Sequence, residues 1–274
     1  VAKVAFTGGS ATGAQVYAKA AKTLKRCTLE LGGKSPNIIF DDADLDDAVK
    51  GAVSGIFAAT GQTCMAGSRL LVQDGIYEEF VESLIDFAGQ AKMGDPMDKS
   101  TQVGPVTTPP QYKKVLDYIA IAKREGAEVL LGGAPASGRP ECGESKYFIE
   151  PTILGKVENS MRIAQEEVFG PVLVIIRFTS DQEAIDIAND ISFGLAAGIW
   201  TRSIKRAMRV SKAIRAGTIW VNTYRAISYM SPFGGYKMSG LGRENGMEAI
   251  REYLQTKSVW ISTADETPNP FVMR

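Results

Sequence analysis

Residues 1–25 of the chain read VAKVAFTGGSATGAQVYAKAAKTLK. The short apolar run at 1–6 predicts a buried strand, and the glycine-rich residues 7–13 predict a turn. Residues 14–25 have the composition of a helix. A strand, a turn and a helix in this order form the unit from which parallel α/β sheets are built.

The same alternation continues to the end of the chain. Apolar runs predict strands, and apolar residues at helical spacing predict helices. The predicted strands cover 27–29, 36–40, 70–72, 148–154, 172–178, 196–201, 218–222 and 257–262, and the predicted helices cover 48–60, 77–91, 111–125, 181–190, 204–214 and 247–254. We therefore expect an α/β fold with a mostly parallel twisted sheet and flanking helices.

Composition bounds the class of protein. The 274 residues are 45% hydrophobic and 23% charged, an ordinary globular balance. Lysine and arginine total 31 and so do aspartate and glutamate, so the net charge is zero. A neutral chain gives no electrostatic reason to expect nucleic acid or a membrane surface as partner. The apolar runs are far shorter than the roughly 20 residues that span a bilayer.

Cysteine and histidine usage narrow the chemistry. Three cysteines, at positions 27, 64 and 142, are too few and too irregularly spaced for a disulfide framework or a zinc site. The chain contains no histidine, which excludes most zinc and non-haem iron sites, and we expect no metal. A reducing compartment is the default, and we expect a cytoplasmic protein.

Cys64 is the candidate nucleophile. It lies in GQTCMAGSR at 61–69, where a helix-ending glycine and polar neighbours indicate a turn rather than a packed core. Its alternative is an inert buried thiol, the usual state of a cysteine. A thiol with a pKa of about 8.5 needs help to ionise, and no imidazole exists here. A carboxylate, a backbone dipole or a bound cationic cofactor remains as the helper.

Glu30 is the candidate general base. It ends an apolar run and precedes Gly32 and Gly33, which permit a sharp turn or a close approach to a ligand. Burial would raise the pKa of its carboxyl toward neutrality. On this pattern alone, a surface or capping glutamate is the more common outcome.

Two segments indicate a nucleotide site. The glycines of 8–13 stand between a strand and a helix, where backbone N–H groups can face a phosphate, although generic turns look similar. In EEVFGP at 166–171, Glu167 can accept hydrogen bonds from a ribose with Phe169 beside it. The alternative is a pair of solvated charges before a core strand.

Five motifs together resemble the aldehyde dehydrogenase superfamily. They are FTGGSATG at 6–13, ELGGKSP at 30–36, GQTC at 61–64, EVFGP at 167–171 and PFGGYKMSG at 232–240. They occur in that family's order and cover essentially the whole chain. The chain corresponds to the C-terminal half of the family's usual length, and its start inside a strand without Met also predicts a fragment of a longer protein.

The resemblance implies a mechanism. Cys64 attacks an aldehyde as thiolate to give a thiohemiacetal, whose oxyanion is held partly by the Cys64 backbone N–H. Hydride passes to NAD or NADP and leaves a thioester, and Glu30 then activates water to release the acid. The resemblance also implies the cofactor contacts, which are Gly8, Gly9 and Gly13 at the pyrophosphate, the Leu31 backbone at the carboxamide, Glu167 at the ribose and Phe169 at the nicotinamide. Gly9 departs from the serine that many relatives carry there.

The resemblance also implies a division of the chain. Residues 1–31 end a Rossmann-like NAD(P)-binding domain with its last strand–helix unit, 32–231 form the catalytic domain, 232–255 return to the cofactor domain, and 256–274 hold an oligomerisation strand and tail. In the family, an oxyanion-hole Asn and a ribose-binding Lys lie upstream of Val4. We therefore expect the 274 residues alone to bind cofactor weakly and turn over poorly, and the full-length protein to be a homodimer or homotetramer.

Substrate identity is the least readable feature. Residues 222–229 resemble the family's substrate-entry loop, and Tyr224, Arg225 and Tyr229 favour a polar, carboxylated or aromatic small-molecule aldehyde. An arginine in a loop is more often simply solvated. Two other functions stay open: a relative that passes the thioester to coenzyme A, and a non-catalytic relative of the crystallin kind. Glu30 argues against the first, and Cys64 with Glu30 against the second.

Overall fold

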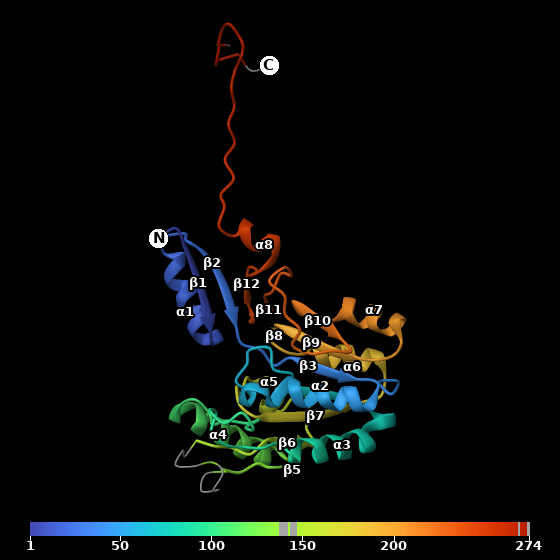
Figure 1. The fold of residues 1–274 in the computed structure, drawn as a ribbon. Coiled ribbons are helices and arrows are strands. Elements are labelled where there is room, and N and C mark those ends of the chain that lie inside the picture. The colour runs from blue at the N-terminus through green and yellow to red at the C-terminus, as the bar shows by residue number, and fades with distance from the viewer. Residues whose placement is uncertain (137–141, 143–146, 268, 273–274) are drawn as a thin grey trace.

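The computed structural model of the protein describes residues 1–136, 142, 147–267 and 269–272. It has the α/β architecture predicted from the sequence (Figure 1). A large layered body carries a seven-stranded sheet, and a small three-stranded sheet stands beside it. The C-terminal tail runs away from both.

The seven-stranded sheet has the order β10-β9-β3-β4-β7-β6-β5. Six strands run parallel, and only β5, at one edge, is antiparallel to its neighbour. In sequence order the strands are β3 (Pro36–Ile39), β4 (Arg69–Gln73), β5 (Glu128–Leu131), β6 (Thr152–Gly155), β7 (Val172–Phe178), β9 (Ala196–Trp200) and β10 (Thr218–Val221). Parallel strands buried on both faces explain the continuous apolar runs in the sequence.

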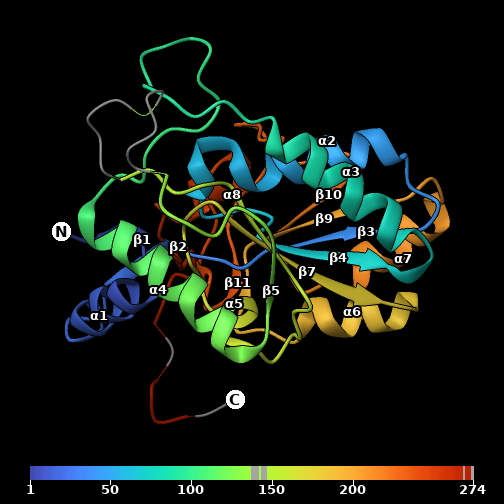
Figure 2. The same cartoon turned by 90° about the horizontal axis from the view of Figure 1, so that it is seen from below.

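Helices cover both faces of this sheet (Figure 2). Helices α2 (Leu45–Phe57) and α3 (Tyr77–Gly89) pack on one face, against residues such as Ile39 and Leu70. Helices α4 (Pro109–Glu125), α6 (Asp181–Asn189) and α7 (Ile204–Ala213) pack on the other, against Ile38 and Leu71. Neighbouring residues of one strand thus enter different cores, as the two-residue period of a strand requires.

Four of these helices begin at a polar capping side chain. Asp44, Thr108, Ser180 and Ser203 each accept a hydrogen bond from the backbone N–H three residues later. Such caps satisfy one of the N–H groups that a helix start leaves without a partner. Helix α4 also has Pro109 at its first position and ends at Gly126, whose φ is +105°.

The small sheet has the order β1-β2-β12. Strands β1 (Lys3–Gly8) and β2 (Arg26–Leu31) are parallel and joined by helix α1 (Ser10–Ala21), while β12 (Gly240–Leu241) is antiparallel to β2. Strand β2 therefore receives the start of the chain on one side and a segment some 200 residues later on the other. The remaining elements are α5 (Arg162–Gln165), β8 (Phe193–Gly194), β11 (Tyr236–Lys237) and α8 (Gly246–Arg251).

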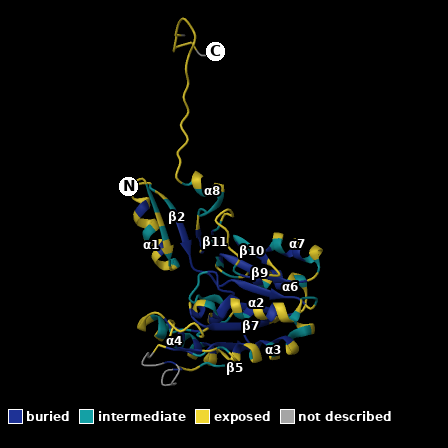
Figure 3. Ribbon diagram, viewed as in Figure 1, coloured by how far each residue is buried: buried dark blue, intermediate teal, exposed yellow. Residues whose placement is uncertain are grey.

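Most predicted elements are confirmed within a few residues. Strand β7 has the predicted bounds, whereas the strand predicted over 148–154 is regular only at Thr152–Gly155. The strand predicted over 257–262 is extended and has no strand partner within the described residues (Figure 3). Its side chains Val259, Trp260 and Ile261 are all exposed. None of the described helices is long and apolar enough to cross a bilayer.

Candidate active site

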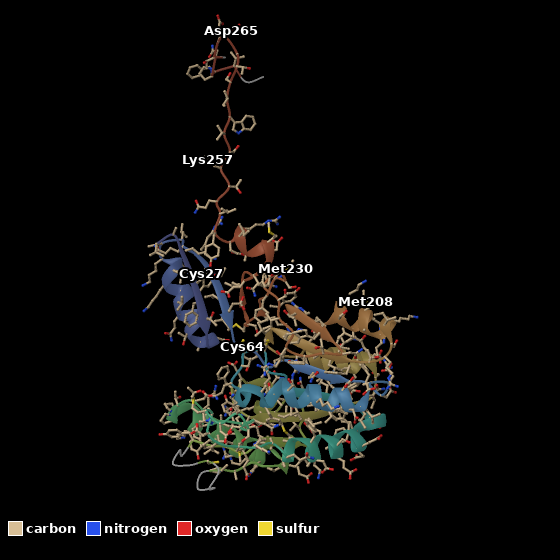
Figure 4. All side chains as sticks on the ribbon, viewed as in Figure 1. Cys27, Cys64, Met208, Met230, Lys257 and Asp265 are labelled. Carbon is tan, nitrogen blue, oxygen red and sulfur yellow. The ribbon has the colours of Figure 1, made fainter. Side chains whose placement is uncertain are left out.

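Cys64 occupies a tight turn between helix α2 and strand β4. After α2 a short 3₁₀ helix, η1 (Ala58–Gly61), leads into the turn, which the Ala66 N–H closes by donating to the Thr63 carbonyl at 3.1 Å. Figure 4 shows Cys64 where the small sheet meets the seven-stranded body. The predicted turn is confirmed, and Cys64 is half-buried.

Gly61 fixes the approach to this turn. Its φ is +67°, and a Cβ placed there would lie 2.0 Å from the Gly170 carbonyl oxygen. Only a glycine combines that backbone angle with that contact. The segment before Cys64 is thereby held against the loop that carries Glu167.

Glu30 is buried in the small sheet. It is the penultimate residue of β2, between Thr7 of β1 and Gly240 of β12. Its side chain is 6% exposed, and neither carboxylate oxygen has a hydrogen-bond partner among the described residues. Burial raises the pKa of Glu30 to about 8, helped by the nearby charge of Glu244 and opposed by that of Arg243. A carboxyl with such a pKa suits general-base catalysis near neutral pH.

Gly32 and Gly33 join the carboxylate of Glu167 to the backbone of Cys64. The Gly33 N–H donates to Glu167 Oε1 at 3.2 Å, and a Cβ on Gly32 would lie 2.1 Å from Glu167 Oε2. A Cβ on Gly33 would lie 3.0 Å from the Cys64 carbonyl oxygen. The glycine pair after Glu30 therefore provides the close approach that the sequence predicts, with Cys64 and Glu167 on either side.

The surroundings of Cys64 disfavour its thiolate. Burial is the largest cause and raises the pKa of the Cys64 thiol, and the carboxylates of Glu167 and Glu30 add to the rise. Hydrogen bonds from the backbone at Met65 and at Cys64 itself oppose it. A positive charge brought between these carboxylates and the sulfur would favour the thiolate.

The predicted phosphate glycines divide into two kinds. Gly9 caps helix α1 without any side-chain cap, and a Cβ there would meet nothing within 4 Å, so the space at the helix start is open. Gly13 is buried, and a Cβ there would lie 2.5 Å from Leu31 Cδ2. Gly13 and Leu31 thus pack α1 onto β2, while the Leu31 N–H donates to the Ser239 carbonyl at 3.0 Å. Gly8 ends β1 and faces the Phe6 ring.

Phe169 lies at the surface of the same loop as Glu167. It is 37% exposed, and its φ is +58°. Gln111 holds this loop, because its side-chain amide donates to the carbonyls of Val168 and Phe169 at 2.7 and 2.8 Å. An exposed ring on an anchored backbone is available to a flat ligand.

The three predicted substrate residues lie in different surroundings. Tyr224 is buried, and its hydroxyl donates to the Met65 carbonyl at 3.0 Å. Arg225 is half-buried and donates to the Ser54 carbonyl at 3.4 Å. Tyr229 is 83% exposed. The structure therefore places Tyr224 beneath the Cys64 turn rather than on an open surface.

Sequence reasoning missed four residues of the site. Gln111, Arg243 and Glu244 come from segments far from Glu30 and Glu167 in the chain, so no local pattern indicates them. Lys34 stands inside a quoted motif but reads as a surface lysine. It is 1% exposed, and its Nζ makes no hydrogen bond within the described residues. Burial lowers the pKa of Lys34 to about 7, together with the charge of Arg69 and against that of Glu167.

No group of three or more acidic or cysteine side chains in the described part of the chain is arranged to hold a metal ion. The candidate site thus consists of one thiol, the buried carboxyl of Glu30, the half-buried carboxyl of Glu167 and backbone N–H groups. Such groups can serve as a nucleophile, as a general base and as hydrogen-bond partners that orient a ligand.

Comparison with known proteins gives a consistent family. The model of the aldehyde dehydrogenase family matches residues 1–259. The chain is 46% identical over 265 residues to a betaine aldehyde dehydrogenase of Mesorhizobium japonicum, covering 97% of this chain and 54% of that protein. It is 48% identical over 264 residues to an aldehyde dehydrogenase of Emericella nidulans, covering 96% and 52%. The chain therefore spans about half the length of the curated relatives it matches.

Solved structures agree. A betaine aldehyde dehydrogenase of Staphylococcus aureus in complex with NAD⁺ superposes with a TM-score of 0.96 at 42% identity, covering 100% of this chain and 54% of that one. The NAD⁺ complex of an aldehyde dehydrogenase from Bacillus cereus gives 0.92 at 45% identity, covering 96% and 52%. Sequence match and superposition extend over nearly the whole chain, and the chain belongs to the aldehyde dehydrogenase family.

Proposed function

We propose that this chain carries the nucleophile and the general base of an NAD(P)-dependent oxidation of an aldehyde to a carboxylic acid. The observation that supports it is that the glycine pair 32–33 meets both Glu167 and the backbone of Cys64, while the charge of Glu30 acts on the Cys64 thiol. Relatives named aldehyde dehydrogenase, and relatives solved with NAD⁺, share this part of the chain.

The proposed reaction starts at the sulfur. Cys64 as thiolate attacks the aldehyde carbon and forms a thiohemiacetal, whose oxyanion the backbone N–H groups of the turn stabilise. NAD(P)⁺, when bound, supplies the hydride acceptor that turns this species into a thioester on Cys64. Glu30 takes a proton from water, the resulting hydroxide attacks the thioester, and the acid leaves as the thiolate re-forms.

The residues present fit a nicotinamide cofactor. The open start of helix α1 at Gly9 offers unpaired N–H groups to a pyrophosphate. The half-buried carboxylate of Glu167 suits ribose hydroxyls, and the exposed Phe169 suits a flat ring. The two carboxylates near Cys64 also favour a cation there, and that charge would lower the pKa of the thiol.

Two narrower proposals accompany this function. The chain spans about half the length of its relatives, and we propose that it oxidises aldehydes slowly by itself; a kcat typical of the family for the purified chain would contradict this. Arg225 and Tyr229 are proposed to favour polar or carboxylated aldehydes. Unchanged relative kcat/KM across semialdehydes in Arg225→Glu would remove that proposal.

The nucleophile can be identified without the cofactor. An activated ester such as p-nitrophenyl acetate transfers its acetyl group to a reactive thiolate, so we expect the acetyl group on the Cys64 peptide by mass spectrometry. Cys27 provides an internal control in the same chain. Acetyl groups on Cys27 and none on Cys64 would contradict the assignment.

Transfer to coenzyme A is the second candidate. Adding coenzyme A to the acetylated protein separates the two functions, because acetyl-coenzyme A would accumulate in one case and free acetate in the other. The buried Glu30, with its pKa near neutrality, favours acetate. The same acetylation argues against a non-catalytic relative.

A further inference from the structure

Tyr224 lies directly beneath the turn that carries Cys64, although the two are far apart in the chain. Its side chain is buried, and its hydroxyl donates a 3.0 Å hydrogen bond to the carbonyl of Met65, the residue after Cys64. The contact joins the loop after β10 to the turn after α2 across 159 positions. Because this hydrogen bond is buried, losing it would lower the free energy of unfolding.

Three glycines leave room for the Tyr224 ring. Gly67, two residues beyond Met65, would place a Cβ 2.9 Å from Tyr224 Cζ and Oη. Gly198 of β9 would place one 2.7 Å from Tyr224 Cδ2, and Gly55 of α2 one 3.3 Å from Cδ1. Trp220 packs on the ring with a centroid distance of 4.7 Å. Glycines from three different elements thus fix the position of the hydroxyl.

The bonded peptide is held at both of its polar groups. The Met65 carbonyl accepts from Tyr224, and the N–H of the same peptide, on Ala66, donates to the Thr63 carbonyl at 3.1 Å. This peptide closes the turn 63–66, in which Cys64 is the first central residue. The backbone groups of Cys64 and Met65 that hydrogen-bond the sulfur belong to the same turn, so holding this peptide limits their movement relative to the sulfur.

We propose that Tyr224 is a positioning residue for Cys64, which holds the 63–66 turn through the Met65 carbonyl so that backbone N–H groups stay directed at the sulfur. The proposal rests on the proposed function for the role of Cys64 as nucleophile. In this proposal Tyr224 affects how fast Cys64 reacts and does not contact the aldehyde.

The test compares Tyr224→Phe with the wild-type chain. The variant keeps the ring in its slot and removes only the hydroxyl. Alkylation of Cys64 by iodoacetamide, followed on its own peptide by mass spectrometry, needs neither cofactor nor turnover, so the result is independent of whether the chain oxidises aldehydes. We expect the pH midpoint of alkylation to move upward and the rate at neutral pH to fall by up to about fivefold, the equivalent of one buried hydrogen bond.

Two further variants separate positioning from stability. Trp200→Phe removes a buried hydrogen bond to Asn37 in the same hydrophobic cluster, so it should lower the denaturant midpoint and leave the Cys64 profile unchanged. Gly67→Ala pushes against the Tyr224 hydroxyl and should move the profile in the same direction as Tyr224→Phe. A Tyr224→Phe variant with the wild-type pH midpoint, destabilised to the extent of Trp200→Phe, would overturn the proposal.

Discussion

Two buried ionisable side chains, Glu30 and Lys34, lie four positions apart and have pKa values displaced toward each other. Burial raises that of Glu30 from 4.5 to about 8 and lowers that of Lys34 from 10.5 to about 7. Both shifts mean that folding disfavours the charged form. Each group therefore makes the free energy of unfolding depend on pH, with opposite sign.

Glu30→Gln tests the first dependence. Between pH 4.5 and 8 the native state holds more protons on Glu30 than the unfolded state, so wild-type stability falls as the pH rises through this window. Glutamine removes the fall. We expect the variant to match the wild type near pH 4 and to be more stable by up to about 5 kcal/mol at pH 9, measured by urea unfolding. Parallel pH profiles for the two proteins would contradict this.

Lys34→Met tests the second. Between pH 7 and 10.5 the unfolded state holds more protons on Lys34, so wild-type stability rises with pH there. Methionine fills a similar volume without a charge. We expect the variant to be more stable than the wild type by up to about 5 kcal/mol at pH 6 and to lose that advantage by pH 10.5, again in urea. An advantage that is the same at both pH values would show that Lys34 does not titrate in this window.

At the residue scale, the sequence predicts which side chains react but not how deeply they are buried or which charges surround them. Cys64 and Glu30 lie in motifs that resemble those of the family and so are predicted as the nucleophile and the base. The glycine pair 32–33 predicts a close approach between segments, and the structure shows one with Glu167 and the Cys64 backbone. Nothing in the sequence indicates that Glu30 and Lys34 are buried, or that the charges of Glu244 and Arg243 act on the pKa of Glu30. These properties depend on segments brought together only by folding.

Helices and strands were predicted best where a regular apolar spacing extends over many residues. Helices α4, α6 and α7 have clear apolar spacing and a polar cap, and α3 has the spacing without a side-chain cap, so the positions of all four could be predicted directly. Strand β5 was missed, and so were β8, β11 and β12, because two-residue strands have no period. Their pairing partners, such as Glu30 for Gly240, are set by tertiary contacts.

Gly61→Ala tests the element that delivers Cys64. The variant places a Cβ 2.0 Å from the Gly170 carbonyl oxygen at a φ of +67°, so the 3₁₀ helix η1 must move. We expect a loss of about 3 kcal/mol in the free energy of unfolding and slower alkylation of Cys64.

Gly75→Ala is the matched control. Gly75 lies in the other short 3₁₀ helix beside β4, η2 (Asp74–Ile76), where a Cβ would meet only Asp41 Cβ at 3.8 Å. Its effect should stay within about 0.5 kcal/mol. Equal stability for the two alanine variants would refute the role of Gly61.

At the scale of the whole molecule, the C-terminal tail exposes apolar side chains. Val259, Trp260 and Ile261 are 72, 93 and 83% exposed on a segment without a strand partner among the described residues. Exposed apolar side chains on an extended backbone favour pairing with another copy. We therefore propose that 256–274 include the oligomerisation strand predicted from the sequence.

Trp260→Glu tests that proposal. We expect light scattering after gel filtration to give an oligomer for the wild-type chain and a smaller mass for the variant at the same concentration. Thr267→Glu, which adds the same charge further along the tail, should leave the mass unchanged. Identical masses for all three proteins would remove the tail from the interface.

The central claim is that Glu30 acts as the general base that activates water to hydrolyse a thioester on Cys64. The most direct measurement is the lifetime of the acetyl group on the Cys64 peptide after p-nitrophenyl acetate is removed. We expect the group to hydrolyse in the wild type, faster as the pH rises through about 8, and to persist at least about 100-fold longer in Glu30→Gln. Equal lifetimes in the two proteins across this pH range would contradict the account.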